Sequence, residues 1–286
     1  MIQKSYSLHK IENPDKFTFK PSDYSRFKYG DGQIAEQFGV ALAKGFIANH
    51  LEKEEVATQI VVLSSPYAFI PTATNEMTKY FIFELNKWLA SKNFPVIQQT
   101  KIHRTTTYKE DYGALDAAAR LALIGNDDFH IDRTFLDGKL VIFIDDIKIT
   151  GSHERMISRM VEKYGLKNDH YFLYFAELVN SKVHPNIENF LNYYKVKSIF
   201  DLLDIINNPK FAFNTRIVKF ILHADSNAFN VFLQSQSFDF IYNLYHLSIC
   251  NGYHLIDAYK TNLATIEKYL SLKVDVDITV TSSFKH

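Results

Sequence analysis

The chain has 286 residues, of which 47% are apolar, so it is long enough to bury a substantial core. Its 32 lysine and arginine residues balance 32 acidic residues, which excludes a strong overall field that would attract nucleic acid or an acidic membrane surface. A single cysteine, Cys250, excludes an internal disulfide, and no apolar run approaches the roughly 18 residues that a bilayer span requires. We therefore expect a cytoplasmic globular protein that binds neither nucleic acid nor membrane.

The first 200 residues alternate between helix and strand patterns, after a polar N-terminal stretch from Met1 to Pro21. In chain order the patterns predict a helix over 32–51, a strand over 60–63, a helix over 77–88, a strand within 94–102, a helix over 114–124, a strand over 140–144, a helix over 157–164 and a strand over 171–179. Strands that alternate with helices indicate parallel pairing with helices on both faces. The predicted fold is a doubly wound, mostly parallel α/β sheet.

A polar stretch from Lys101 to Gly113 separates the second strand from the next helix and contains three consecutive threonines. Long loops without regular structure are uncommon inside compact domains and often serve as lids over active sites. We therefore predict a loop that covers a site.

Beyond residue 198 the pattern changes to consecutive helices, over 199–206, 215–222, 228–233, 238–250 and 255–270. We predict an α/β domain over 1–200, in which 1–30 is an extension or a hood over the site, and a C-terminal helical region over 201–286. The last residues, 271–286, show a strand-like alternation in Val274, Val276 and Ile278, to which we assign no role.

The residues from Leu140 to Glu154 combine a buried strand, two adjacent carboxylates and a short loop that opens a helix. Ligands of parallel sheets bind beyond the carboxyl ends of the strands, where Asp145 and Asp146 are expected to lie. An ionised carboxylate only accepts hydrogen bonds, and a sugar diol supplies the donors. The free N–H groups at the start of the next helix favour a phosphate. The segment therefore predicts a site for ribose 5-phosphate.

The stretch from Val141 to Ser152 resembles the phosphoribosyl pyrophosphate signature of type I phosphoribosyltransferases. The resemblance implies that Asp145 and Asp146 bind the ribose hydroxyls at the catalytic centre. It also implies that a loop wraps the 5′-phosphate, formed by Lys148, Ile149, Thr150, Gly151, Ser152 and His153. Lys148 and His153 depart from the usual pattern, which has an apolar residue and a threonine or serine there. Ile149 also replaces an aspartate that is frequent in purine-using members.

The resemblance implies two further loops. A pyrophosphate-binding loop would correspond to Ser64, Ser65, Pro66 and Tyr67, which follow the first buried strand. A mobile loop that closes over the substrate would correspond to Lys101–Gly113, and its Arg104 and Lys109 would neutralise pyrophosphate as catalytic residues.

The implied activity transfers ribose 5-phosphate between phosphoribosyl pyrophosphate and a nitrogenous acceptor. Mg²⁺ would be held mainly through the ligand, with Asp145 and Asp146 as its candidate protein ligands. A homodimer is one compatible assembly. The alternative is a module that senses phosphoribosyl pyrophosphate or a nucleotide without turning it over.

Ordinary structural interpretations remain open at each position. Asp145 and Asp146 are also compatible with two solvated acids at the end of a strand, and Pro66 alone would explain a turn after the first buried strand. Gly30-Asp31-Gly32 has the shape of a dinucleotide fingerprint, but it lacks the preceding strand, so we do not expect that role. Phe27–Tyr29 line either a base-binding hood or the core. We further expect Asp146→Asn to weaken sugar binding and to leave the fold intact.

Overall fold

The computed structural model describes residues 2–53, 58–104 and 129–283, with the backbone alone from residue 273 onward. The predicted helix over 114–124, most of the predicted lid and Lys109 lie outside these residues. The α/β part contains β1 (Gln3–Ile11), α1 (Pro21–Lys28), α2 (Gly32–Phe46), η1 (Ile47–Leu51), β2 (Ile60–Ser64), α3 (Ala73–Ser91), β3 (Gln98–Gln99), β4 (His103–Arg104), β5 (Phe129–His130), α5 (Arg133–Leu136), β6 (Leu140–Lys148), α6 (Ser152–Lys163) and β7 (His170–Leu178).

A five-stranded sheet in the order β1-β7-β6-β2-β3 forms the centre of this part, and its strand pairs are parallel. The middle strands β2, β6 and β7 are nearly continuous runs of buried residues, as expected for parallel strands covered on both faces. The predicted doubly wound α/β fold is confirmed.

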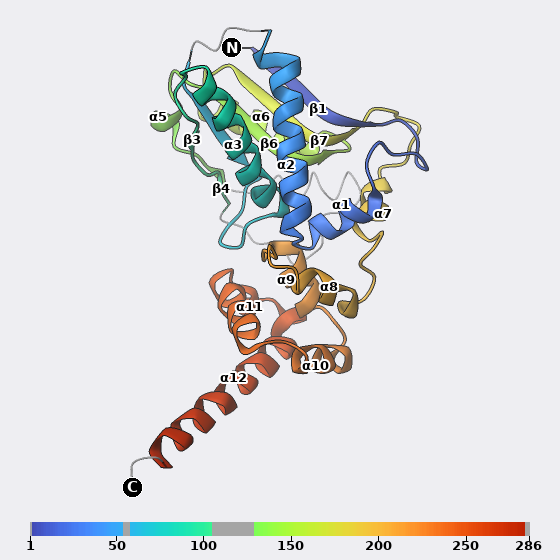
Figure 1. The fold of residues 1–286 in the computed structure, drawn as a ribbon, viewed down its shortest axis with the longest axis vertical. Helices are drawn as coiled ribbons and strands as arrows, with labels where there is room; N and C mark the ends of the chain where they lie inside the picture. The colour runs from blue at the N-terminus through green and yellow to red at the C-terminus, as the bar shows by residue number, and fades with distance from the viewer. Residues whose placement is uncertain (1, 54–57, 105–128, 284–286) are drawn as a thin grey trace.

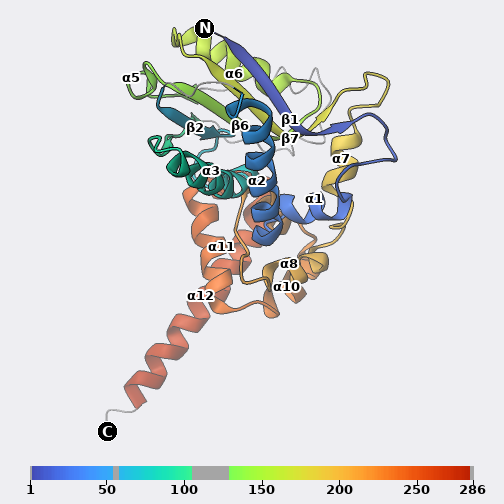
Figure 2. The same ribbon diagram turned by 45° about the horizontal axis from the view of Figure 1, so that its top comes forward.

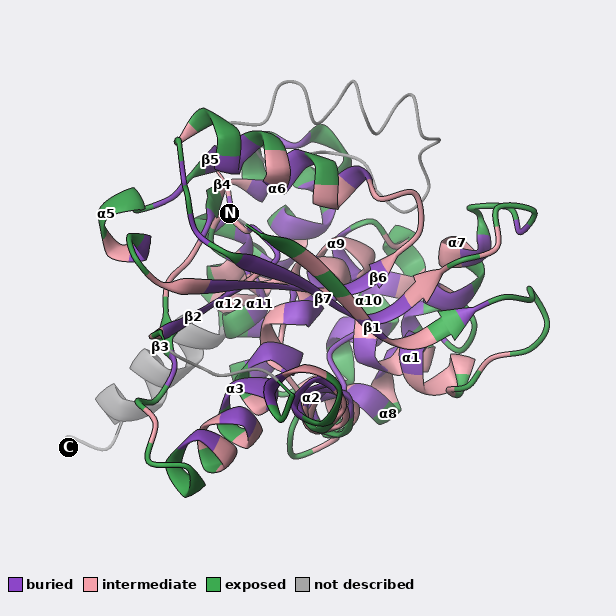
Figure 3. Cartoon of the chain, turned by 90° about the horizontal axis from the view of Figure 1, so that it is seen from above, coloured by how far each residue is buried: buried purple, intermediate pink, exposed green. Residues whose placement is uncertain are grey.

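Helices cover both faces of the sheet (Figure 3). Because side chains alternate along a strand, Ile142 and Ile144 of β6 pack with α1, α2 and α3 on one face, whereas Val141 and Phe143 pack with α5 and α6 on the other. The two apolar faces of β6 therefore anchor two separate clusters of the same core.

The structure differs from the sequence prediction at several elements. The polar N-terminal stretch forms β1, an edge strand that pairs with β7, followed by the short helix α1. The strand expected within 94–102 is reduced to the two residues of β3. The strand expected over 140–144 continues to Lys148, so both aspartates lie within β6.

The α/β part ends with α7 (Ile187–Asn192), whose Ile187 and Leu191 belong to the same core cluster as α1 and α2. The C-terminal part consists of η3 (Ile199–Leu202), α8 (Leu203–Ile206), α9 (Thr215–Leu222), α10 (Ser226–Gln234), α11 (Phe238–Cys250), η4 (Tyr253–Leu255) and α12 (Asp257–Ser283). Its helices lie below the sheet in Figure 1 and enclose an apolar cluster of their own. Tyr29 and Ile70 from the α/β part are members of that cluster. The two parts therefore share buried residues.

The last helix, α12, projects from the body of the protein towards the C-terminus (Figure 2). It runs to Ser283, so the alternating residues Val274, Val276 and Ile278 are helical and do not form a strand. Within the described residues, no helix combines the length and the apolar character that crossing a bilayer needs.

Candidate functional site

The central strands β2 and β6 frame the point where the sheet reverses its winding. After β2 the chain crosses through α3 to β3 on one side, whereas after β6 it crosses through α6 to β7 on the other side. These two connections lie on opposite faces of the sheet. A crevice therefore opens beyond the carboxyl ends of β2 and β6, which is where parallel α/β sheets bind ligands.

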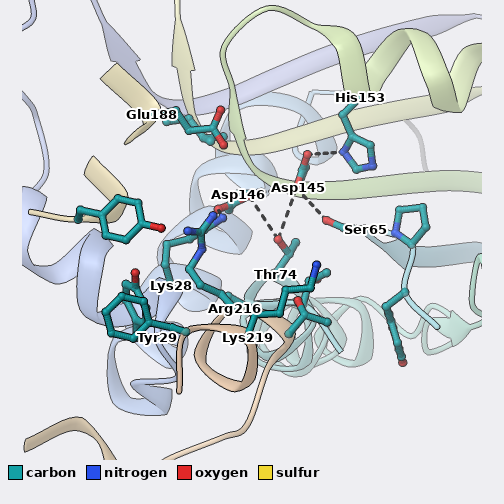
Figure 4. A pocket seen from close by; sticks show the side chains of 18 of the residues that line it. Lys28, Tyr29, Ser65, Thr74, Asp145, Asp146, His153, Glu188, Arg216 and Lys219 are labelled. Carbon is teal, nitrogen blue, oxygen red and sulfur yellow. Dashed lines mark hydrogen bonds and ion pairs between the residues drawn. The ribbon is translucent and has the colours of Figure 1, made fainter. Parts of the chain in front are cut away.

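Asp145 and Asp146 enter this crevice from adjacent positions of β6, and their side chains are only 15% and 7% exposed. Since neighbouring residues of a strand point to opposite faces, the two carboxylates diverge. Thr74, in the first turn of α3, lies between them, with its Oγ1 3.4 Å from Oδ1 of each aspartate (Figure 4). Divergence and the shared hydroxyl reduce the repulsion between the two adjacent anions.

Each carboxylate also has its own cationic partner. Asp146 forms an ion pair with Lys28 of α1 and accepts a 2.7 Å hydrogen bond from the Tyr24 hydroxyl. Asp145 contacts Nδ1 of His153, in the first turn of α6, and accepts a 2.8 Å hydrogen bond from Ser65. The two anions are thus compensated from different elements.

These contacts shift the proton affinities of the site. Burial disfavours the charged form of Asp145, but His153 and the Ser65 hydroxyl favour it more strongly and hold the pKa of Asp145 well below its usual range. Burial also opposes the charged form of His153, yet the Asp145 carboxylate outweighs burial and raises the pKa of His153. Burial, together with the adjacent Asp146, raises the pKa of Tyr24 well above its usual range, so its hydroxyl remains a donor. The site therefore places a carboxylate whose charged form is favoured beside an imidazole whose charged form is also favoured.

The loop between β6 and α6 has the conformation of an anion cradle. Gly151 adopts φ +69°, in the left-handed region that favours glycine, and no side chain caps α6. Thr150 and Ser152 share a 2.8 Å hydroxyl hydrogen bond, and Arg155 donates to the Thr150 carbonyl and the Ser152 hydroxyl at 2.8 and 3.0 Å. Since the first N–H groups of a helix have no intrahelical acceptor, they remain available to a ligand.

Lys148 and Ile149 complete the sequence-predicted loop and lie on the wall of the same cavity. The Lys148 ammonium lies 2.8 Å from Glu154 and 3.3 Å from Glu177. Burial opposes its charge, but the two carboxylates outweigh burial and raise the pKa of Lys148. Lys148 therefore holds two carboxylates at the rim of the site, whereas Ile149 packs against the core.

The predicted pyrophosphate loop follows β2 and faces the carboxylates. Ser65, Pro66 and Tyr67 line the cavity, while Ser64 lies within β2 and accepts a hydrogen bond from Asn75. Lys101 donates to the Ala68 carbonyl at 2.5 Å and lies over the Tyr67 ring, which holds the loop in place.

Arg104 belongs to β4 and also lines the cavity, and its N–H donates to the Tyr67 carbonyl at 3.4 Å. The structure therefore brings Arg104 together with the other predicted site residues. It does not describe Lys109.

The fold adds several residues to the site that no local pattern of the sequence indicates. Lys28, Thr74, Arg216 and Lys219 all line the cavity, and the last two come from α9 in the C-terminal part (Figure 4). Of the aromatic stretch before α2, Phe27 packs in the core, whereas Lys28 and Tyr29 reach the cavity wall. No spacing in the sequence relates α1 or α9 to β6, so only the tertiary structure could reveal this convergence.

The Gly30-Asp31-Gly32 stretch has a structural role. Asp31 caps α2 by accepting from the N–H groups of Gln33 and Ile34. A side chain on Gly30 or Gly32 would collide with the backbone of Ala212 or Lys210, so these glycines allow the C-terminal part to approach closely.

Among the described residues, no group of three or more histidine, cysteine, aspartate or glutamate side chains is arranged to hold a metal ion. The donor set that the crevice does present is the carboxylate pair, Asp145 and Asp146. Mg²⁺ commonly takes one or two protein carboxylates and fills its octahedron with water and ligand phosphates. The pair therefore fits an ion that arrives with a phosphorylated ligand.

The family model described as PRTase ComF-like matches residues 2–266. Similar solved structures include a hypoxanthine phosphoribosyltransferase from Staphylococcus aureus, with 12% identity over 50% of this chain and 74% of that chain and a TM-score of 0.31. The hypoxanthine-guanine enzyme of L. donovani is 10% identical over 51% and 72%, with a TM-score of 0.31. A Trypanosoma cruzi hypoxanthine phosphoribosyltransferase is 15% identical over 53% and 77%, also with a TM-score of 0.31. No curated protein matches the sequence.

Proposed function

The chain belongs to the ComF-like phosphoribosyltransferase family, and from this membership we propose that it transfers ribose 5-phosphate from phosphoribosyl pyrophosphate to a nitrogenous acceptor. The bond between the anomeric carbon and the pyrophosphate oxygen breaks, and the pyrophosphate keeps the electron pair. A bond from that carbon to the acceptor nitrogen forms, and the nitrogen loses its proton. The observation that carries the proposal is the carboxylate pair beside the glycine loop of α6, in the crevice between β2 and β6.

The ribose and its 5′-phosphate take the β6 side of the crevice. Asp145 and Asp146 accept hydrogen bonds from the ribose 2′ and 3′ hydroxyls, because carboxylates in this position have acceptor capacity and little water. The 5′-phosphate rests against the first turn of α6, where Thr150, Gly151 and Ser152 supply hydroxyls and a close backbone. Lys148 and His153 orient this loop through their carboxylate partners.

The pyrophosphate group takes the β2 side. The loop from Ser65 to Tyr67 supplies backbone donors, and Arg104 supplies positive charge at the leaving oxygen. Lys109 is a second candidate for that charge. Ser64 positions this loop, because it ends β2 and accepts a hydrogen bond from Asn75.

Mg²⁺ is the proposed cofactor, with Asp145 and Asp146 as the side chains that would hold it beside the ligand. When bound, it would supply charge neutralisation of the pyrophosphate. The residues of the chain bind and orient the sugar and exclude water from it.

Pyrophosphate release from phosphoribosyl pyrophosphate and Mg²⁺, measured across a panel of nitrogenous bases, tests the proposal. We expect release with at least one acceptor and its loss in Asp145→Asn. Asp137→Asn is the matched control, since Asp137 makes the same charge change at an exposed position before β6. Tight binding of phosphoribosyl pyrophosphate in calorimetry, with no release of pyrophosphate for any acceptor, would instead identify a sensor. This alternative is supported by the cationic partners that the protein itself supplies to both carboxylates.

A further inference from the structure

The cavity around the carboxylates is larger than one small ligand requires. Its volume is about 1090 Å³, whereas pockets for a single drug-sized ligand span roughly 300–1,000 Å³. The proposed ribose-phosphate site occupies the wall formed by β2, β6 and α6. The opposite wall belongs to the C-terminal helices, and nothing in the ribose-phosphate chemistry accounts for it.

Helix α9 provides the cationic part of that opposite wall. Its residues Ile217, Val218, Ile221 and Leu222 are buried in the C-terminal core, so its other face, with Arg216, Lys219 and Phe220, meets the cavity. Both cationic side chains extend into the cavity in Figure 4. From Ile205 to Ala224 the sequence has no acidic residue, so α9 brings no carboxylate of its own to this face.

Hydrogen bonds fix α9 relative to the α/β part. Asn214 caps the helix and donates to the Lys28 carbonyl at 3.2 Å, and the Thr215 N–H donates to the Pro71 carbonyl at 2.9 Å. Lys28 pairs with Asp146, and Pro71 ends the loop that follows β2. The cationic face is thus held at a fixed position opposite the predicted sugar site, as a preorganised subsite requires.

Aromatic rings lie directly beside these cations. Tyr193, Phe220 and Tyr29 form a cluster in which Tyr29 and Phe220 meet edge to face at 5.1 Å and Tyr193 lies 6.3 Å from Tyr29. The Arg216 guanidinium lies 6.0 Å from the Tyr193 ring. All three rings line the cavity. Such a surface suits a flat ring, while the cations suit an acidic group attached to that ring.

Other charges face the same space. Glu188 and Asp225 are the acidic residues of the C-terminal wall, against Lys197, Arg216 and Lys219. Asp225 accepts hydrogen bonds from the N–H groups of Asn227 and Ala228 through Oδ1 as the cap of α10, so this oxygen is directed at that helix. Among these described residues, three cations therefore face two carboxylates.

We infer that this wall is the acceptor subsite, and that it takes an aromatic nitrogen heterocycle bearing a carboxylate. The ring would lie against Tyr193 and Phe220, and the carboxylate would be held by Arg216 and Lys219. This inference rests on the proposed function for the identity of the second substrate, but the binding of an acidic ring can be measured without turnover.

Matched pairs of small rings test the inference by calorimetry, with ribose 5-phosphate and Mg²⁺ present. Nicotinate is compared with nicotinamide, and orotate with uracil, so that each pair differs by a carboxylate. We expect at least one acid to bind about tenfold more tightly than its neutral partner, as one charge-assisted hydrogen bond allows. Equal binding within both pairs, or no binding of either acid, would overturn the inference.

Variants of α9 locate the effect. Lys219→Met should abolish the preference for the acid, Lys219→Arg should restore it, and both should leave the affinity for phosphoribosyl pyrophosphate unchanged. Lys210→Met is the control, because Lys210 pairs with Glu36 outside the cavity. A loss of phosphoribosyl pyrophosphate affinity as large as the loss of acid affinity would show that Lys219 serves the pyrophosphate, which contradicts the inference. If the acid preference is present but no pyrophosphate is released, the subsite stands and the proposed transferase activity fails.

Discussion

The ion pair between Asp146 and Lys28 changes what a substitution of Asp146 should do. The expectation that Asp146→Asn leaves the fold intact treated Asp146 as an acid at the end of a strand, whereas it is a buried residue within β6. The side chains of Asp146 and Lys28 are only 7% and 13% exposed. Removal of one partner leaves the other charge buried, which is more costly than the loss of the pair itself.

We therefore predict that Asp146→Asn lowers the free energy of unfolding by about 3–5 kcal/mol, in addition to weakening sugar binding. Urea denaturation followed by circular dichroism measures the change. The double variant Lys28→Met with Asp146→Asn removes both charges and should recover most of the loss. A single variant as stable as the wild type would show that the pair is solvated in solution.

The Asp145–His153 pair predicts a pH dependence of stability. The raised pKa of His153 means that its contribution is complete below its unfolded pKa of about 6.5 and is lost as the pH rises through the higher folded value. The lowered pKa of Asp145 means that its contribution is complete above its unfolded pKa of about 3.9 and is lost as the pH falls through the lower folded value. The contributions of His153 and Asp145 to stability are therefore both complete between the two unfolded pKa values, about 3.9 and about 6.5.

We expect thermal unfolding of the wild type, relative to His153→Gln, to show its largest advantage between about pH 4 and pH 6.5. The advantage should decrease as the pH rises from 6.5 through the raised pKa of His153, because the imidazole then loses its charge in the folded state as well. Melting curves of both proteins across this range measure it. A difference in melting temperature that does not vary with pH would mean that His153 is neutral in the fold.

The elements that sequence analysis placed correctly are those with strong local patterns. The runs of β2 and β6 are buried on both faces, so their apolar character is continuous and unambiguous. The glycine loop before α6 combines a left-handed residue with hydroxyls, a combination that short-range chemistry determines. These elements were sufficient to predict the sheet and to bring the two carboxylates and the glycine loop together at its edge.

The elements that it missed depend on contacts distant in sequence. β1 has mostly polar residues because it is an edge strand, and only its pairing with β7, more than 160 residues away, makes it a strand. α1 and α9 carry the cations Lys28, Arg216 and Lys219 to the site, and their own patterns show only where each helix is apolar. Local sequence therefore predicted the carboxylates and the loops around them, and it could not predict the cations that α1 and α9 add.

Asn251, at the end of α11, tests how the C-terminal part supports the loop that follows β2. Its Oδ1 accepts hydrogen bonds from the N–H groups of Phe69 and Ile70 at 3.0 and 2.9 Å, and Ile70 is fully buried. Asn251→Ala leaves the buried N–H of Ile70 without an acceptor, which costs about 1–3 kcal/mol. We predict this loss in urea denaturation, with a weaker affinity for pyrophosphate measured by calorimetry. Asn251→Asp keeps the acceptor and should retain both properties, whereas equal losses in the two variants would contradict the explanation.

The α/β and helical parts are joined by shared core residues and by backbone hydrogen bonds. Tyr29 and Ile70 belong to the C-terminal cluster, and the Ala212 N–H donates to the Gly30 carbonyl at 3.0 Å. Separation of the parts would expose these residues. The division near residue 200 thus remains a prediction about sequence organisation, and we expect the chain to unfold as one cooperative unit.

Gly32→Ala tests this cooperativity at the contact itself. Alanine within a helix is normally favoured over glycine by about 0.5–1 kcal/mol. Here a Cβ would lie 1.9 Å from the Lys210 carbonyl oxygen, and forced displacement of packed backbone costs about 1–3 kcal/mol. We therefore predict a net loss of stability and, in calorimetry, a single transition that moves as a whole to lower temperature. Gln33→Ala, at the exposed next position of α2, lacks the collision and should not lower the transition. If Gly32→Ala instead splits the melt into two transitions, the parts fold independently and the contact only positions α9 over the carboxylates.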